Sequence, residues 1–294
     1  MVGAYRTIVW NDLIGRLTEQ RIFDHYTPTL ALPREPGWNV PSESAFAVLR
    51  IGHAMVREKY QLNDRFNGVS AAPNVAVLLQ FFDKLSGQPL PPGTIWEIDW
   101  SRFFDMGRDN GGGFNHSAKI RPALPSALAT LSTKKLALFP SAEGMLTSLA
   151  FRALMRGFLV GLPSGQAAAP AVSAKLGFGV RTLSSAQISA SLTAAANDGL
   201  CAMDRNRCLS GDDIEVLSQH TPLFLYVLLE ADIFGDGSKL GPVGSDFLCH
   251  AFAGGLRVPA DDPDRNISTI SGVGLPGTMP ELLRFLEQHR SPEV

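Results

Sequence analysis

Six histidines and three cysteines are the residues of this chain best suited to metal binding or nucleophilic chemistry, and their spacing excludes several common sites. The cysteines, at positions 201, 208 and 249, form no CxxC pair of the kind that binds zinc, and no HExxH motif occurs. The sequence also lacks a Walker phosphate loop, a GxSxG nucleophile motif and a GxGxxG motif after a strand. We therefore expect no zinc, nucleotide-binding or serine-hydrolase site of these types.

His53 differs from the other histidines in its neighbours. Apolar residues from Glu43 to about Tyr60 recur at helical spacing and predict a helix with His53 on its buried face. A histidine in such a place is more often a core residue than a metal ligand. However, Gly52 leaves out a side chain beside it, and Arg50, one turn earlier, can pair with a carboxylate. This combination suits a planar cofactor that carries acidic groups.

The elements that must position these residues are mainly helical. Strand signals are scarce, and no internal repeat or interdomain linker is recognisable, so we expect one mainly α domain over residues 1–294. Ser42 is placed to cap the helix that carries His53, and Thr278 with Glu281 has the spacing of a capping box. Helices are predicted over residues 4–18, 43–60, 74–86, 95–106, 142–160, 185–197, 211–218, 222–234, 243–255 and 279–289.

The composition predicts a folded chain without a strong global charge. Hydrophobic residues make up 45% and charged residues 18% of the sequence, which is enough apolar material for a sizeable core. Lys and Arg total 26 against 28 Asp and Glu, so the net charge of −2 provides no global field for gripping nucleic acid. No apolar run reaches the ~20 residues of a membrane span, and the first residues lack the pattern of a signal peptide. We therefore expect no nucleic-acid partner and no membrane span, with the cytoplasm as the default location.

The stretch AFAVLRIGHAMVREKY, from Ala45 to Tyr60, resembles the proximal-histidine helix of the animal-type haem peroxidases, the peroxidase–cyclooxygenase superfamily. In that family an Arg-x-Gly-His run supplies the axial haem ligand. Further blocks resemble the family in the same order along the chain, namely Tyr5–Ile14, Met155–Gln166, Thr221–Tyr226, Lys239–Gly244 and Met279–Phe285. The resemblance implies a haem peroxidase-like helical domain that lacks the distal-side N-terminal part.

The resemblance also implies a cofactor and a reaction. It assigns haem b as the cofactor, His53 as the ligand of its iron, and Arg50 and Arg156 as partners of its propionates. Gly52 would leave room for the haem plane. The family reaction is the oxidation of a small reducing substrate, organic or halide, by hydrogen peroxide.

Two departures from the family pattern affect this expectation. In the family, an Asn accepts the ring N–H of the proximal histidine, and Ala153 occupies that position here, which implies a less basic ligand. The family's distal histidine and arginine precede the region matched by this chain, so no distal catalytic residue is identified. His25 follows the 4–18 helix, out of the family order, and is not assigned a distal role. The resemblance thus implies a missing distal half or a partner chain that supplies it.

Two alternative functions follow from the same residues. Fatty-acid dioxygenases of the superfamily need a tyrosyl radical beside a lipid channel, and Tyr226 in PLFLYVLLE is the best candidate. A core tyrosine with a bonded hydroxyl is the competing interpretation of Tyr226. The second alternative is a non-catalytic descendant that keeps the scaffold for protein contacts, for which we expect an exposed apolar surface.

Overall fold

The structure is a computed structural model that describes residues 2–67, 74–79, 88, 93–108, 113–129, 148–196, 209–261 and 276–289. Across these residues the regular structure is helical, and β pairing is limited to isolated bridges. The prediction of a mainly α fold is therefore confirmed for the part of the chain that is described. No helix in these ranges is long and apolar enough to cross a membrane.

The chain begins with a helix of three consecutive parts, α1 (Val2–Ile8), the π-helical η1 (Val9–Ile14) and α2 (Gly15–Leu17). This confirms the helix predicted over residues 4–18. The extended backbone of Thr18 ends it, and α3 (Gln20–Tyr26) and the 3-10 helix η2 (Thr27–Ala31) follow. The sequence analysis did not predict α3, because a helix of seven residues is too short to show a clear period.

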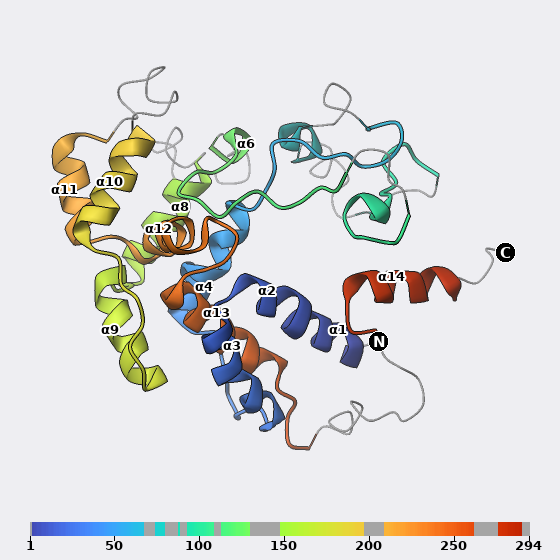
Figure 1. Ribbon diagram of the computed structural model, residues 1–294, viewed down its shortest axis with the longest axis horizontal. Coiled ribbons are helices and arrows are strands. Elements are labelled where there is room, and N and C mark those ends of the chain that lie inside the picture. The colour runs from blue at the N-terminus through green and yellow to red at the C-terminus, as the bar shows by residue number, and fades with distance from the viewer. Residues whose placement is uncertain are drawn as a thin grey trace.

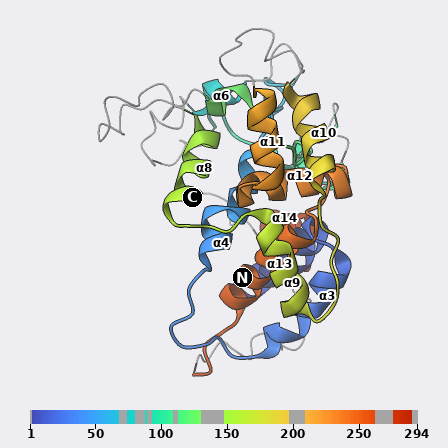
Figure 2. The same ribbon diagram turned by 90° about the vertical axis from the view of Figure 1, so that its left-hand side faces the viewer.

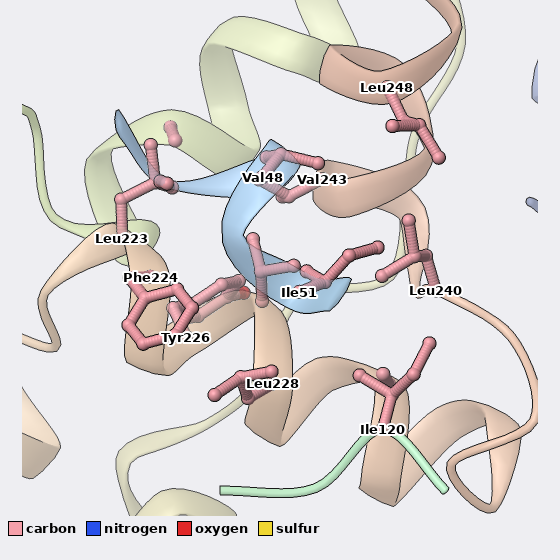
Figure 3. Close-up of a cluster of buried hydrophobic side chains, with 14 of the residues drawn as sticks. Val48, Ile51, Ile120, Leu223, Phe224, Tyr226, Leu228, Leu240, Val243 and Leu248 are labelled. Atoms are coloured by element: carbon pink, nitrogen blue, oxygen red, sulfur yellow. The ribbon is translucent and has the colours of Figure 1, made fainter. Parts of the chain in front are cut away.

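The core is built around α12 (Leu223–Gly235) and α13 (Pro242–Leu256), in which most residues are buried. The turn between these helices uses two residues with positive φ, Asp236 at 48° and Gly237 at 68°. The 3-10 helix η3 (Val48–His53) packs on both helices, and its Val48 and Ile51 belong to the same buried cluster as Val243 (Figure 3). The segment that carries His53 is thus anchored in the centre of the fold.

The other helices surround this core. The successive helices α10 (Ser185–Ala196) and α11 (Gly211–Gln219) lie side by side in both views (Figure 1, Figure 2). The last helix, α14 (Met279–Gln288), lies beside the N-terminal helix, where its Met279 N–H donates to Asp12. The predictions for 185–197, 211–218, 222–234, 243–255 and 279–289 are confirmed, as is the capping box of Thr278 and Glu281. The remaining helices of the described residues are α4 (Ser42–Phe46), η4 (Trp100–Arg102), α6 (Ser126–Ala129), α8 (Leu149–Leu159) and α9 (Gly165–Leu176).

Two predicted helices are wrong in extent. The helix expected over 43–60 ends at His53, because α4 stops at Phe46, Ala47 leaves helical geometry and η3 takes over. The helix expected over 95–106 is reduced to η4, where the buried Arg102 instead bonds the side chains of Asp64 and Asn67. In both places tertiary contacts outweigh the local helical pattern.

The structure also departs from the sequence-based expectations at the start of α4 and at α9. Ser42 does not cap α4, since Pro41 is the N-cap and the Ser42 hydroxyl donates to Glu43. The Ala-rich α9 was not predicted, because it has no apolar period and contains Pro170. Of the predicted segments 74–86 and 142–160, residues 75–79 and 149–159 are helical, whereas 80–86 and 142–147 lie outside the described residues.

Gly165, the first residue of α9, allows this helix to touch the core. A Cβ atom at position 165 would lie 1.8 Å from Cγ of Tyr226, whose side chain is fully buried. The Tyr226 ring cannot move away easily, because its hydroxyl accepts a hydrogen bond of 3.1 Å from the Leu183 N–H. The sequence therefore needs glycine at this position for packing.

We expect Gly165→Ala to lower the free energy of unfolding by roughly 1–3 kcal/mol, since the added methyl group overpacks the core. Urea denaturation followed by circular dichroism measures the change. Gly211→Ala is the matched control, because Gly211 also begins a helix and its Cβ would meet no atom within 4 Å. Equal stability of the two variants would contradict this account of the contact.

Candidate functional site

His53 is positioned by the geometry of η3. In a 3-10 helix, residues three apart lie on the same face. Val48 and Ile51 therefore share the buried face, with 0% and 4% of their surface exposed. Arg50 and His53 share another face, and both are half-buried. The predicted α-helix was wrong here, but the three-residue spacing still places Arg50 and His53 together.

The imidazole of His53 lacks a hydrogen-bond partner on its inner side. Its Nδ1 atom is buried and unpaired. Burial lowers the pKa of His53 below its ordinary value, and the charges of Arg50 and Arg152 lower it further. The ring is therefore held neutral near pH 7, which is the form in which histidine binds metals.

Arg50 and Arg152 lie close enough to act on this ring through their charges, and Arg156 lies close to Arg50. Burial lowers the pKa of Arg50, and the nearby charge of Arg156 lowers it further. Arg152 and Arg156 are one turn apart on α8, so they share a face of that helix. Within the described residues none of the three forms an ion pair, and the Nε atom of Arg152 is buried without a partner. We call Arg50, His53, Arg152 and Arg156 the cationic cluster.

Among the described residues, no carboxylate forms an ion pair with the arginines of the cationic cluster. Guanidinium groups are always charged at neutral pH, and like charges in a partly buried place repel each other. Arg50 has a single weak hydrogen bond, from Nε to the Ala45 carbonyl at 3.4 Å. A bound anion would relieve this repulsion and satisfy the free N–H groups. The cluster thus has the chemistry of a carboxylate-binding site.

Gly52 adds an open face beside His53. Its Cβ would meet no atom within 4 Å, and its φ is not positive. Neither packing nor backbone conformation therefore requires glycine at this position. The close approach of a flat ligand to the imidazole would explain why position 52 is glycine.

Arg152 acts on His53 through its charge, and Ala153 follows it on α8. Ala153 is buried, with 1% of its surface exposed, and it offers no acceptor to the unpaired Nδ1 of His53. The sequence analysis did not identify Arg152 as a site residue. The signal that could have found it is its four-residue spacing from Arg156 within a helix.

The other candidate residues lie in different settings. His25 is exposed on α3, with its ring edge-on to Tyr26, and no distal role is assigned to it. Tyr226 is fully buried with a bonded hydroxyl, and burial raises its pKa to about 12. This is the setting of a core tyrosine. Cys249 is buried and free, whereas Cys201 and Cys208 lie outside the described residues.

The described residues contain no group of three or more His, Cys, Asp or Glu side chains that could hold a metal ion. A bare metal ion needs several protein ligands, whereas the iron of haem needs only one axial nitrogen. His53 therefore belongs to no such group among the described residues.

A second buried polar group lies elsewhere and joins three helices. The Tyr26 hydroxyl of α3 donates to Oδ1 of Asp246 in α13 over 2.7 Å, and Lys175 Nζ of α9 donates to Oδ2 over 3.0 Å. Burial raises the pKa of Tyr26, and the carboxylate of Asp246 raises it further. Burial also raises the pKa of the adjacent Cys249 thiol to about 12, so this thiol is not a nucleophile at neutral pH. The group holds helices together and offers no reactive atom.

Comparison of the chain with family models, with curated proteins and with solved structures found no match.

Proposed function

We propose that the chain binds haem b through His53 and acts as a peroxidase-type oxidoreductase, as its resemblance to the animal-type haem peroxidases implies. The observation that carries the proposal is a neutral, half-buried imidazole beside arginines that form no ion pair within the described residues. Haem is planar and carries two carboxylates, so it matches both the imidazole and the positive charge. The open face at Gly52 supports the same ligand.

Three residues of the cationic cluster and Gly52 have a role in this proposal. His53 offers a ring nitrogen to the iron, and Arg50 and Arg156 hold the propionates through their guanidinium groups. Gly52 keeps a side chain out of the haem plane. Bound haem would supply the redox chemistry by which hydrogen peroxide oxidises a small reducing substrate, organic or halide.

The inner nitrogen of His53 sets the strength of the ligand. A histidine that binds iron through Nε2 must hold its proton at Nδ1, and here Nδ1 has no acceptor in the described part of the chain. A neighbouring acceptor would make the imidazole more electron-rich, so its loss leaves a weaker ligand. We therefore propose an iron reduction potential that is higher than in relatives that have the acceptor.

Haem titration followed by absorption spectroscopy tests the proposal. The wild-type chain is expected to give the Soret band of histidine-ligated haem, and His53→Ala is expected to lose it with at least roughly tenfold weaker binding. His25→Ala is the matched control, because His25 is exposed on another helix and should leave the spectrum unchanged. Identical spectra from all three proteins, each resembling free haem, would overturn the proposal.

The arginines give a separate expected result. Arg50→Ala and Arg156→Ala should each weaken haem binding by roughly 10- to 100-fold, because each removes a charge-assisted hydrogen bond, while the Soret position stays that of a histidine ligand. Arg16→Ala is a suitable control, since Arg16 is an exposed arginine that pairs with Asp12 on the N-terminal helix. Unchanged affinity in both Arg50→Ala and Arg156→Ala would contradict their role.

The second candidate function is a non-catalytic descendant that keeps the scaffold without turning over peroxide. The unpaired Nδ1 of His53 favours it, since Ala153 stands at the sequence position of the family's acceptor and no other described residue pairs with this nitrogen. Peroxide-dependent oxidation of a phenolic substrate by the haem-loaded chain distinguishes the two. A chain that binds haem through His53 without turnover would support the descendant.

A further inference from the structure

The C-terminal end of α8 exposes four apolar side chains close together in the sequence. The exposed fractions are 38% for Met155, 81% for Phe158, 74% for Leu159 and 44% for Val160. We call these residues the α8 tip. In Figure 2 this end of α8 lies at the edge of the molecule, where the chain turns toward α9. Single exposed apolar residues are ordinary, but four together point to a contact surface.

The charge around the α8 tip is positive. From residue 144 to residue 197 the sequence contains no Asp or Glu, and its basic residues are Arg152, Arg156, Lys175 and Arg181. Lys175 and Arg181 are paired with Asp246 and Glu19, respectively. The two arginines of α8 form no ion pair in the described part of the chain. The region of α8 is therefore locally positive, although the whole chain has a net charge of −2.

We propose that the α8 tip seats in the interfacial layer of a bilayer that contains anionic phospholipid. In the haem-free chain Arg156 is exposed between Met155 and Phe158, where it can meet lipid phosphate while the apolar side chains enter the acyl boundary. Phe158 and Leu159 protrude from the surface, with most of their area free. A fluid lipid layer encloses protruding side chains without a matching pocket, whereas a protein partner has to supply one.

Vesicle flotation tests this proposal without haem. The wild-type chain should float with vesicles of phosphatidylcholine mixed with phosphatidylglycerol and much less with phosphatidylcholine alone, and added salt should weaken binding. Phe158→Ser with Leu159→Ser should weaken binding by at least roughly tenfold, since it removes the apolar contact. Leu32→Ser with Val216→Ser is the matched control, because these residues are 54% and 62% exposed elsewhere.

Several outcomes would overturn the proposal. One is a wild-type chain that does not float, and another is an equal loss of binding in the tip variant and the control variant. A third is wild-type self-association by light scattering that the tip variant abolishes without any vesicle binding, which would make the tip a contact between proteins. Thermal melts show whether the tip variant is folded. Its unchanged Soret titration separates a failure here from a failure of haem binding.

Discussion

Asp246→Ala is expected to lower the free energy of unfolding by roughly 2–4 kcal/mol, because it removes a buried carboxylate that accepts two hydrogen bonds. Asp246 has 0% of its surface exposed and accepts hydrogen bonds from the Tyr26 hydroxyl and from Lys175. Its loss leaves the Tyr26 hydroxyl buried without an acceptor. Lys175 also loses its counter-charge, but its side chain is 38% exposed, so solvent screens most of that loss. The three residues belong to three different helices, so the loss also loosens their packing.

Urea denaturation of two further variants isolates this effect. Asp24→Ala is the matched control, since Asp24 is an exposed residue of α3 that bonds only Gln20 and should change stability by no more than about 0.5 kcal/mol. Tyr26→Phe in the Asp246→Ala background should recover part of the loss, because it removes the unpaired hydroxyl. A loss in Asp246→Ala no larger than in Asp24→Ala would refute the assignment of a buried network.

Sequence patterns predicted the elements that carry strong local signals. The last helix was predictable because Thr278 and Glu281 form a capping box and the apolar spacing that follows is regular. The segment around His53 was not, because its apolar residues fit two alternative faces. Leu49, which the predicted α-helix buries, is 42% exposed, whereas Val48 and Ile51 are buried. Only the contact of η3 with α12 and α13 selects the second face.

Some residues of the candidate site could likewise be predicted from the sequence, whereas others depend on tertiary packing. Arg50, Gly52 and His53 were predictable because they are neighbours in the sequence, and any tight helix places the first and the last on one face. The approach of Arg152 and Arg156 to them depends on how α8 packs, which a local pattern does not encode. The network of Asp246 was even less accessible, since Tyr26 precedes Asp246 by 220 residues and Lys175 precedes it by 71.

Glu230 gives a second large expected effect, which depends on pH. Its side chain is fully buried on α12, and its two oxygens accept from the N–H groups of Val243 and Gly244 at 3.2 and 3.1 Å. These groups belong to the first turn of α13, so Glu230 caps that helix from its neighbour. Gly241 makes the approach possible, because its Cβ would lie 2.1 Å from Cγ of Glu230.

Burial raises the pKa of Glu230 from 4.5 to about 8, although the two backbone hydrogen bonds act in the opposite direction. The folded chain therefore keeps a proton that the unfolded chain releases between these two pH values. The stabilisation from this group is complete below about pH 4.5 and is lost as the pH rises to about 8. The corresponding free energy is roughly 3–5 kcal/mol, on the scale of 1.4 kcal/mol for each pKa unit.

Glu230→Gln removes this pH dependence, because the amide stays neutral throughout. Near pH 8 and above, the variant should be more stable than the wild type, since no charge is buried. Near pH 4.5 it should be the less stable of the two, because its NH₂ group faces a backbone N–H and loses one of the two hydrogen bonds. Urea denaturation across this range measures the difference between the two proteins.

The difference between wild type and variant is the informative quantity, because other groups change stability over the same pH range. Burial lowers the pKa values of His53 and His250, so their contribution to stability grows as the pH rises to about 6.5. Those contributions are common to both proteins and cancel in the difference. Glu215→Gln, at an exposed position of α11, should follow the wild-type curve. Parallel curves for Glu230→Gln and the wild type would mean that Glu230 is ionised in the fold, with the α13 N-terminus outweighing its burial.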